Sequence, residues 1–254
     1  MKHLRAATRF LQMLKRLVTI ACLSAATGAL AQDRTVRDLA LPDGYQRATY
    51  QKGSYSHWLQ GAPLKNSNHI DLYDGRSYKP GSNWYRVAAV LDFPLLFDQD
   101  LEQCADFAMR LWAEYHAATG QHTKLYLFNY DGSKKQLKDA SKYRNFLRLA
   151  MAYSNSHSIK QGAKKITASE LQPGDMFVQN ETGGIGHVSV IVDVAKSKVA
   201  GKPDLYQVGF SFMPAQEFHI EKAEGNRGWF TREGFEKLLE QRLGSMGKPV
   251  LRRF

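Results

Sequence analysis

The change of hydrophobic period along the chain is the feature that most constrains its fold. Between residues 98 and 120, apolar side chains recur at three- and four-residue spacing, which predicts an amphipathic helix that begins at Asp98 or Asp100. From residue 171 to 212 the period becomes that of strands and includes the β-prone run 187–194. Helices that precede an antiparallel meander indicate an α+β fold rather than an alternating parallel one.

Cap and turn signals place the other elements. Ser54 predicts the start of a short helix, and Thr231 the start of a helix near the C-terminus. The apolar run 84–93 predicts a central buried strand. We also expect strands at 125–130, 176–179 and 205–212, and a helix at 140–151.

The first 31 residues have the layout of a secretory signal. A basic segment precedes the apolar and small-residue stretch 17–30, and Ala29-Leu30-Ala31 is typical of a cleavage site. We therefore expect export to the periplasm or beyond, with no integral membrane span in the mature chain. The less favoured alternative is a lipoprotein anchored through Cys22.

Cleavage after Ala31 changes the charge of the chain. The full sequence has a net charge of +11; the leader holds five of the 35 basic residues and no acidic ones, which leaves 30 basic and 24 acidic residues, or +6. This balance favours anionic envelope partners, although most of these charges are expected to lie scattered on a solvated surface, and nucleic acid is not an expected partner outside the cytoplasm. The oligomeric state is left open.

The same cleavage leaves Cys104 as the one thiol of the mature chain, so no intramolecular disulfide is expected. A place in the first turns of a helix would stabilise the thiolate through the unpaired backbone N–H groups. Glu102 and Asp106 would oppose this effect if they faced the sulfur. The alternative is that Cys104 only joins the apolar stripe of the helix, since free cysteine is among the most buried residue types.

A cysteine nucleophile needs an imidazole and a polar group that orients the ring. His187 is the candidate base, because it follows a glycine-rich loop and begins a strand, where we expect an exposed ring. Antiparallel pairing about a centre near residue 200 would place His187 opposite residues 211–213, which indicates Ser211 as the third member. Gln216 is the other candidate, and His219 a weaker one.

The order of these residues resembles that of papain-like cell-wall cysteine hydrolases of the NlpC and CHAP type. The features that carry this resemblance are Cys104 near a helix start, the turn 171–175, Gly186-His187-Val188 and the strand after it. The resemblance implies that Cys104 and His187 form a catalytic pair. Around the cysteine the sequence is Gln-Cys-Ala-Asp, where NlpC enzymes have Asp-Cys-Ser-Gly.

A second resemblance is to an uncharacterised bacterial family, domain of unknown function 4846. It covers most of residues 40–254 and implies no activity. The segments that carry it are Gln103-Cys104-Ala105-Asp106, Arg110-Leu111, Ala113-Glu114-Tyr115, Leu72-Tyr73-Asp74-Gly75-Arg76, Met213-Pro214-Ala215-Gln216 and Arg252-Arg253-Phe254.

Together these observations predict a leader at 1–31, an N-terminal region at 32–97 packed on the core, and a papain-like core with a C-terminal helix at 98–254. The expected function is that of a secreted thiol hydrolase or acyltransferase that acts on an amide bond, with peptidoglycan peptide as substrate. The alternative is a non-catalytic envelope-binding protein that keeps the fold. Neither function implies a metal or a cofactor.

Overall fold

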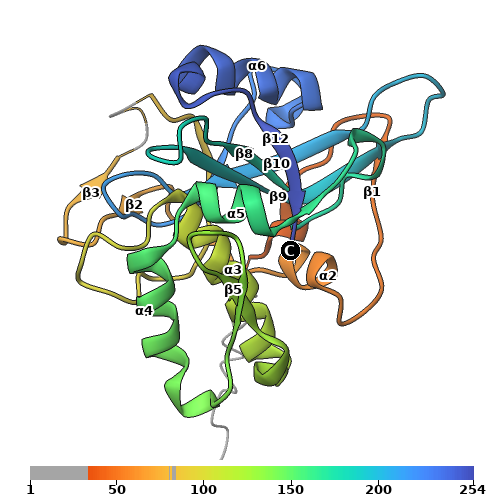
Figure 1. Ribbon diagram of the computed structural model, residues 1–254. Coiled ribbons are helices and arrows are strands. Elements are labelled where there is room, and N and C mark those ends of the chain that lie inside the picture. The colour runs from red at the N-terminus through yellow and green to blue at the C-terminus, as the bar shows by residue number, and fades with distance from the viewer. Residues whose placement is uncertain (1–33, 80, 82–83) are drawn as a thin grey trace, which may run out of the picture. The chain divides into compact units, whose positions relative to one another are not determined.

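An antiparallel sheet of eight strands forms the centre of the fold (Figure 1). The computed structural model describes residues 34–79, 81 and 84–254, so the leader and Cys22 lie outside the described residues. Seven strands follow the order β4-β11-β10-β9-β8-β12-β7, and β1 pairs with β9. These strands are β1 (Tyr45–Arg47), β4 (Val87–Val90), β7 (Lys164–Lys165), β8 (Met176–Gln179), β9 (His187–Ser197), β10 (Leu205–Phe210), β11 (His219–Glu221) and β12 (Val250–Arg253).

Strand β9 is the longest strand of this sheet and its central one. Its β-branched residues favour the extended backbone, and residues 187–195 are buried. Val188 and Val190 pack into the apolar cluster of α3, whereas Ile191 and Val194 pack into the cluster of α6. The continuous apolar run thus reflects a strand that is covered on both faces.

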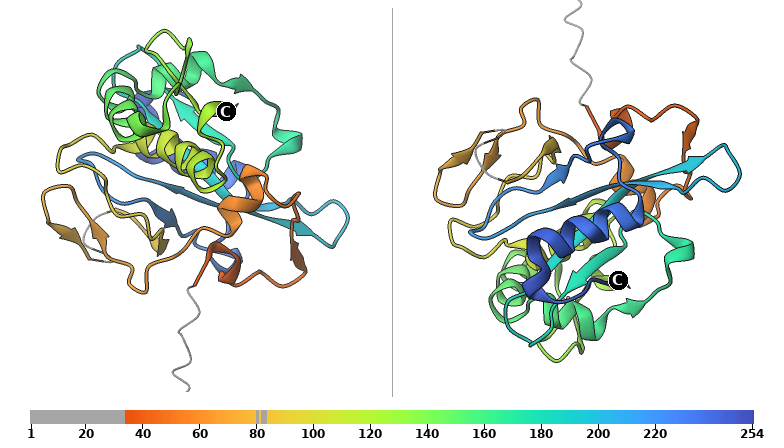
Figure 2. Two further views of the ribbon diagram at one scale, coloured as in Figure 1. Left: turned by 90° about the horizontal axis from the view of Figure 1, so that it is seen from below. Right: turned by 90° about the horizontal axis from the view of Figure 1, so that it is seen from above.

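Helices lie on both faces of the sheet. Helices α2, α3 and α5 pack on one face, and α6 packs on the other (Figures 1 and 2). The α-helices are α2 (Tyr55–Gln60), α3 (Cys104–Ala118), α4 (Tyr143–Tyr153), α5 (Ser156–Gly162) and α6 (Arg232–Leu243). The described residues therefore form a mixed fold of helices and antiparallel sheet.

Short elements complete the described part of the chain. Two small hairpins pair β2 with β3 and β5 with β6. Their strands are β2 (Ile70–Asp71), β3 (Ser77–Tyr78), β5 (Tyr126–Phe128) and β6 (Lys134–Gln136), and the 3₁₀ helices are η1 (Val36–Asp38), η2 (His122–Lys124), η3 (Ala140–Lys142), η4 (Ala168–Glu170), η5 (Asn226–Gly228) and η6 (Gly244–Met246). Among the described residues, no helix combines the length and apolar character needed to cross a bilayer.

The segment before residue 98 contributes two strands, β1 and β4, to the main sheet. The prediction that the run 84–93 is a central strand was wrong, because β4 lies at the end of the strand order. Ala89 and Val90 of this strand are nevertheless buried, since the chain near Leu64 covers that edge. The N–H of Lys65 donates to the carbonyl of Val90 at 2.9 Å, and Leu64 bridges Leu91.

Several sequence predictions are confirmed. The Ser54 side chain accepts the N–H of His57 at the start of α2, and Thr231 accepts that of Gly234 at the start of α6. The pairing of β9 with β10 is centred near residue 200, as expected, from Leu205↔Ala195 to Gln207↔Asp193. A bulge then shifts the register by one residue. The paired register ends at Gly209, so residues 211–213 lie beyond it.

Candidate thiol and imidazole site

Helix α3 begins later than the sequence predicts. Its N-cap is Gln103, and neither Asp98 nor Asp100 caps it. The carboxylate of Asp100 instead accepts the backbone N–H of Ala215 at 2.6 Å and the side chain of Gln103 at 3.0 Å. These bonds tie the turn before α3 to the loop after β10, and they place Cys104 at the first residue of the helix.

A buried ion pair fixes the same turn. The guanidinium of Arg110 donates to Glu102 Oε1 at 2.6 Å. Glu102 Oε2 accepts the backbone N–H groups of Leu96 and Phe97 at 2.6 and 3.0 Å. Burial raises the pKa of Glu102, and the charge of Arg110 opposes that shift. The carboxylate of Glu102 thus holds the chain that leads into α3.

The thiol of Cys104 forms hydrogen bonds with the backbone on either side of His187. Its Sγ donates to the carbonyl of Gly186 at 3.7 Å, and the N–H of Val188 hydrogen-bonds to the sulfur. The residue is 6% exposed. Burial raises the thiol pKa to about 12, the negative charge of Asp106 adds to the rise, and nearby backbone N–H groups oppose it. The resting thiol is therefore protonated.

His187 is fully buried, so the exposed ring expected from the sequence was wrong. Its ring lies against Phe210 and Phe212, with centroids 4.9 and 5.5 Å apart. Burial, with a smaller contribution from nearby His219, lowers the pKa of His187 to about 3, so the ring is neutral near pH 7.

A hydrogen bond of 3.0 Å joins Nε2 of His187 to the hydroxyl of Ser189, whereas Nδ1 has no partner. No hydrogen bond joins either ring nitrogen of this histidine to Cys104 Sγ. Sequence reasoning missed Ser189. The two-residue period of a strand could have identified it, because residues 187 and 189 lie on one face.

The two predicted orienting residues serve other contacts. Ser211 donates its hydroxyl to the carbonyl oxygens of Glu102 and Gln216, at 2.9 and 2.6 Å, and so ties the end of β10 to the start of α3. Gln216 donates its amide to the hydroxyl of Tyr85 at 3.0 Å. In this arrangement Ser189, rather than either of them, is hydrogen-bonded to the imidazole of His187.

Polar atoms without protein partners gather near the two candidate residues. The described side chains here include Oε1 of Gln216 and Nδ1 of His219, both buried and unpartnered. The ring of His219 lies 4.5 Å from that of Tyr85, and its Nε2 is 3.4 Å from the carboxylate of Glu221. Buried polar groups are normally hydrogen-bonded, so this cluster is a candidate site for a polar ligand or reactant.

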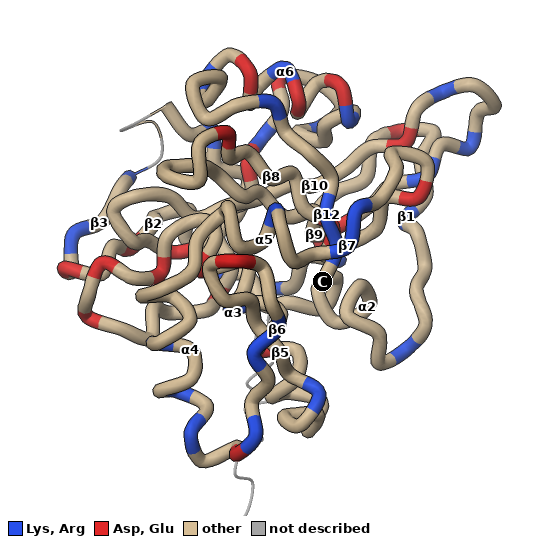
Figure 3. Tube along the Cα trace, in the orientation of Figure 1, with Lys and Arg blue, Asp and Glu red and all other residues tan. Residues whose placement is uncertain are grey.

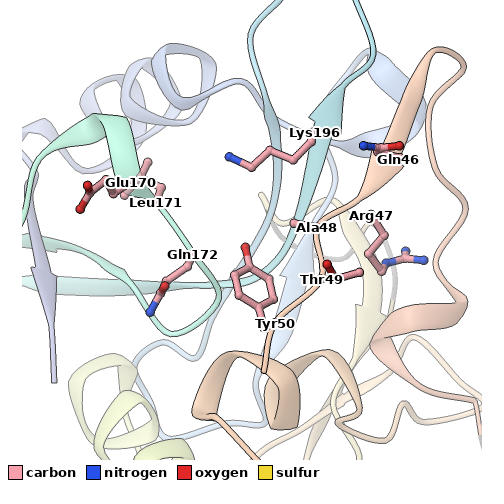
Figure 4. Close-up of a pocket in the computed structure, with 9 residues that line it drawn as sticks. All are labelled: Gln46, Arg47, Ala48, Thr49, Tyr50, Glu170, Leu171, Gln172 and Lys196. Atoms are coloured by element: carbon pink, nitrogen blue, oxygen red, sulfur yellow. The ribbon is translucent and has the colours of Figure 1, made fainter. Parts of the chain in front are cut away.

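No group of described His, Cys, Asp and Glu residues has the arrangement of a metal site. A separate cavity of about 550 Å³ lies between the segment after β1 and the turn before β8 (Figure 4). Tyr50 and Lys196 point into it from opposite sides. Lys196 stands nine residues along β9 from His187, about 30 Å at the rise of a strand, and neither a thiol nor an imidazole lines the cavity.

The neutral, buried His187 predicts a specific pH dependence of stability. Its pKa is about 3 when folded and 6.5 in an ordinary setting, so below pH 6.5 the unfolded chain binds a proton that the native protein excludes. Between pH 7 and 5, the free energy of unfolding should fall by about 2 kcal/mol more in the wild type than in His187→Gln. Urea unfolding at both pH values measures this difference; parallel changes would contradict the assignment.

Gly186 is expected to tolerate no side chain. A Cβ there would overlap the carbonyl oxygen of Gln179 and the hydroxyl of Ser156. Gly186→Ala should therefore lower the free energy of unfolding by about 1–3 kcal/mol, the usual range for overpacking. Gly184→Ala is the matched control, because its Cβ would meet nothing closer than Thr182 Oγ1 at 3.6 Å. Equal stability of the two variants would contradict this packing.

The described residues thus combine helices with an antiparallel sheet, and a cysteine at a helix start contacts the strand that carries a buried histidine. The family model described as domain of unknown function (4846) matches residues 36–138 and 128–242. The chain belongs to this family. No curated protein and no solved structure matches the chain.

Proposed function

We propose that this protein is an exported thiol hydrolase or acyltransferase with a papain-like core, which acts on an amide bond of the cell envelope through Cys104 and His187. Peptidoglycan peptide is the proposed substrate. The observation that carries the proposal is the contact of Cys104 Sγ with the carbonyl of Gly186, 3.7 Å away. This contact brings the start of α3 to the residue before His187, although 82 positions separate the two in sequence.

In the proposed reaction the pair starts neutral. With Nε2–H donating to Ser189, the free electron pair of His187 lies on Nδ1, which has no protein partner. This nitrogen takes the thiol proton as Cys104 Sγ attacks the amide carbonyl carbon. The imidazolium then gives the proton to the leaving amine, and the thioester passes to water or to a second amine. Ser189 is a positioning residue in this scheme.

The same helix start offers groups that would stabilise the transition state. The backbone N–H groups of Cys104 and Ala105 lie close enough to the sulfur to favour its anion. N–H groups at a helix start carry part of the helix dipole and can also bind a developing oxyanion. Phe212 is a partly exposed ring beside His187, and its displacement by substrate would give the amide carbonyl access to the thiol.

The burial of Cys104 favours a second candidate function. A thiol that is 6% exposed, with its pKa raised to about 12, also fits a core residue. The protein would then be a non-catalytic envelope component that keeps the fold and binds its ligand elsewhere. This candidate requires that Cys104→Ala leaves every activity of the protein unchanged.

Product analysis separates the two candidates. Purified protein is incubated with peptidoglycan fragments that carry their stem peptides, and the products are identified by mass spectrometry. The proposed enzyme yields fragments cut or transferred at one amide bond, and Cys104→Ala yields none. Binding of the fragments without any product, in wild type and variant alike, would support the second candidate and contradict the first.

A further inference from the structure

The positive charge of the chain is concentrated in one segment. Residues 121–165 contain ten basic and two acidic side chains, a balance of +8, whereas the remaining residues after position 31 contain 20 basic and 22 acidic ones. The basic residues of the segment are Lys124, Lys134, Lys135, Lys138, Lys142, Arg144, Arg148, Lys160, Lys164 and Lys165. The net charge of the mature chain thus comes from this segment, which we call the basic segment.

None of these ten cations forms an ion pair with a described carboxylate. Elsewhere in the described chain, arginines and lysines on many elements are paired, as Arg232 is with Glu236 on α6. Figure 3 shows the same contrast: basic residues lie along β6 and the stretch that leads into α4, whereas basic and acidic residues are mixed along α6. The positive surface of the basic segment is therefore not neutralised within the protein.

Exposed aromatic rings accompany this charge. Tyr130 and Tyr153 are 52% and 74% exposed, and they lie at the β5–β6 turn and at the end of α4. Apart from Tyr153 at its end, the exposed residues of α4 are polar or small, as at Arg144, Asn145 and Arg148, so the helix has no apolar stripe free to enter a bilayer. Exposed tyrosine rings in a basic segment suit sugar rings that carry anionic groups.

We propose that the basic segment binds an acidic polysaccharide. Cations on three successive elements, β6, η3 and α4, match the repeated charges of a linear polymer. The export expected from the leader favours an envelope polysaccharide over nucleic acid. The surface also borders the candidate site, because the hydroxyl of Tyr130 donates to the carbonyl of Gly183 in the loop before His187. Binding does not require the thiol.

The test measures binding of the purified full chain to fluorescein-labelled polygalacturonate, with neutral dextran as the control polymer. The affinity should fall at least about tenfold between 0.05 and 0.3 M NaCl, because salt screens exposed charges. The variant Lys135→Glu, Lys138→Glu, Lys142→Glu should bind at least about tenfold more weakly at low salt. The matched variant Lys198→Glu, Lys237→Glu, Lys248→Glu has the same net charge and should lose less than about threefold.

Equal losses in the two triple variants would overturn the proposal, since net charge alone would then explain binding. Tighter binding to vesicles containing phosphatidylglycerol, or to a 20-nucleotide single strand, would overturn it in favour of another partner. Cys104→Ala should bind polygalacturonate like the wild type. The two proposals are therefore tested independently. A negative binding result would not contradict amide cleavage at Cys104, and absence of amide cleavage would not contradict polysaccharide binding.

Discussion

Arg110→Met is expected to lower the free energy of unfolding by about 3–5 kcal/mol, the range for removing one partner of a buried ion pair. The substitution leaves the carboxylate of Glu102 buried, with only the N–H groups of Leu96 and Phe97 as donors. Methionine keeps most of the side-chain volume, so the loss reports on charge rather than on a cavity. Chemical denaturation at pH 7 measures the effect.

Two variants make this expectation specific. Arg148→Met, on the exposed face of α4, removes an arginine without a described ion pair and should change the free energy of unfolding by about 0.5 kcal/mol or less. Adding Glu102→Gln to Arg110→Met removes the uncompensated charge and should recover part of the loss. Additive losses in the double variant would mean that the two side chains do not stabilise each other.

Cys104→Ser is expected to reduce cleavage or transfer at the amide bond by at least about 10³-fold. The serine hydroxyl is smaller than the thiol and far harder to ionise, and Nδ1 of His187 is a weak base because burial lowers the pKa of the ring to about 3. Such a base can move a proton from a thiol more readily than from an alcohol. Turnover of peptidoglycan fragments under saturating conditions measures the loss.

Stability must be separated from chemistry in this experiment. Cys104→Ser buries a hydroxyl where the thiol met the carbonyl of Gly186, so the fold should survive with a modest change. Ser189→Ala is the informative companion, since it removes the one hydrogen bond to His187 and should lower kcat more than it raises KM. Turnover within about twofold of wild type in Cys104→Ser would rule out the thiol as nucleophile.

Local signals in the sequence predicted much of the fold. Side-chain caps such as Ser54 and Thr231 act within three residues, and the strand period of β9 depends on its own β-branched residues. The edge position of β4 could not be predicted in this way, because it depends on the chain near Leu64. The start of α3 was misplaced for a similar reason: Asp100 bonds to Ala215, a partner more than 100 residues away.

The candidate site shows the same division. The sequence identified Cys104 and His187 as the candidate pair, and in the structure the cysteine contacts the backbone that flanks the histidine. The burial of Cys104 was one of two alternatives that the sequence left open. The burial of His187 could not be predicted, because Phe210 and Phe212 reach the imidazole from a neighbouring strand and its continuation. The partner of the ring was also missed, since Ser189 lies on the same strand as His187 rather than on the opposite one.

The most direct test of the central claim is the mass of the intact protein during turnover. The reaction with a peptidoglycan fragment is quenched in acid, and the site of any adduct is mapped by tandem mass spectrometry. The account predicts a transient increase equal to the acyl part of the substrate, located on Cys104 and absent from Cys104→Ala. An adduct on another residue, or product formation by Cys104→Ala at the wild-type rate, would contradict it.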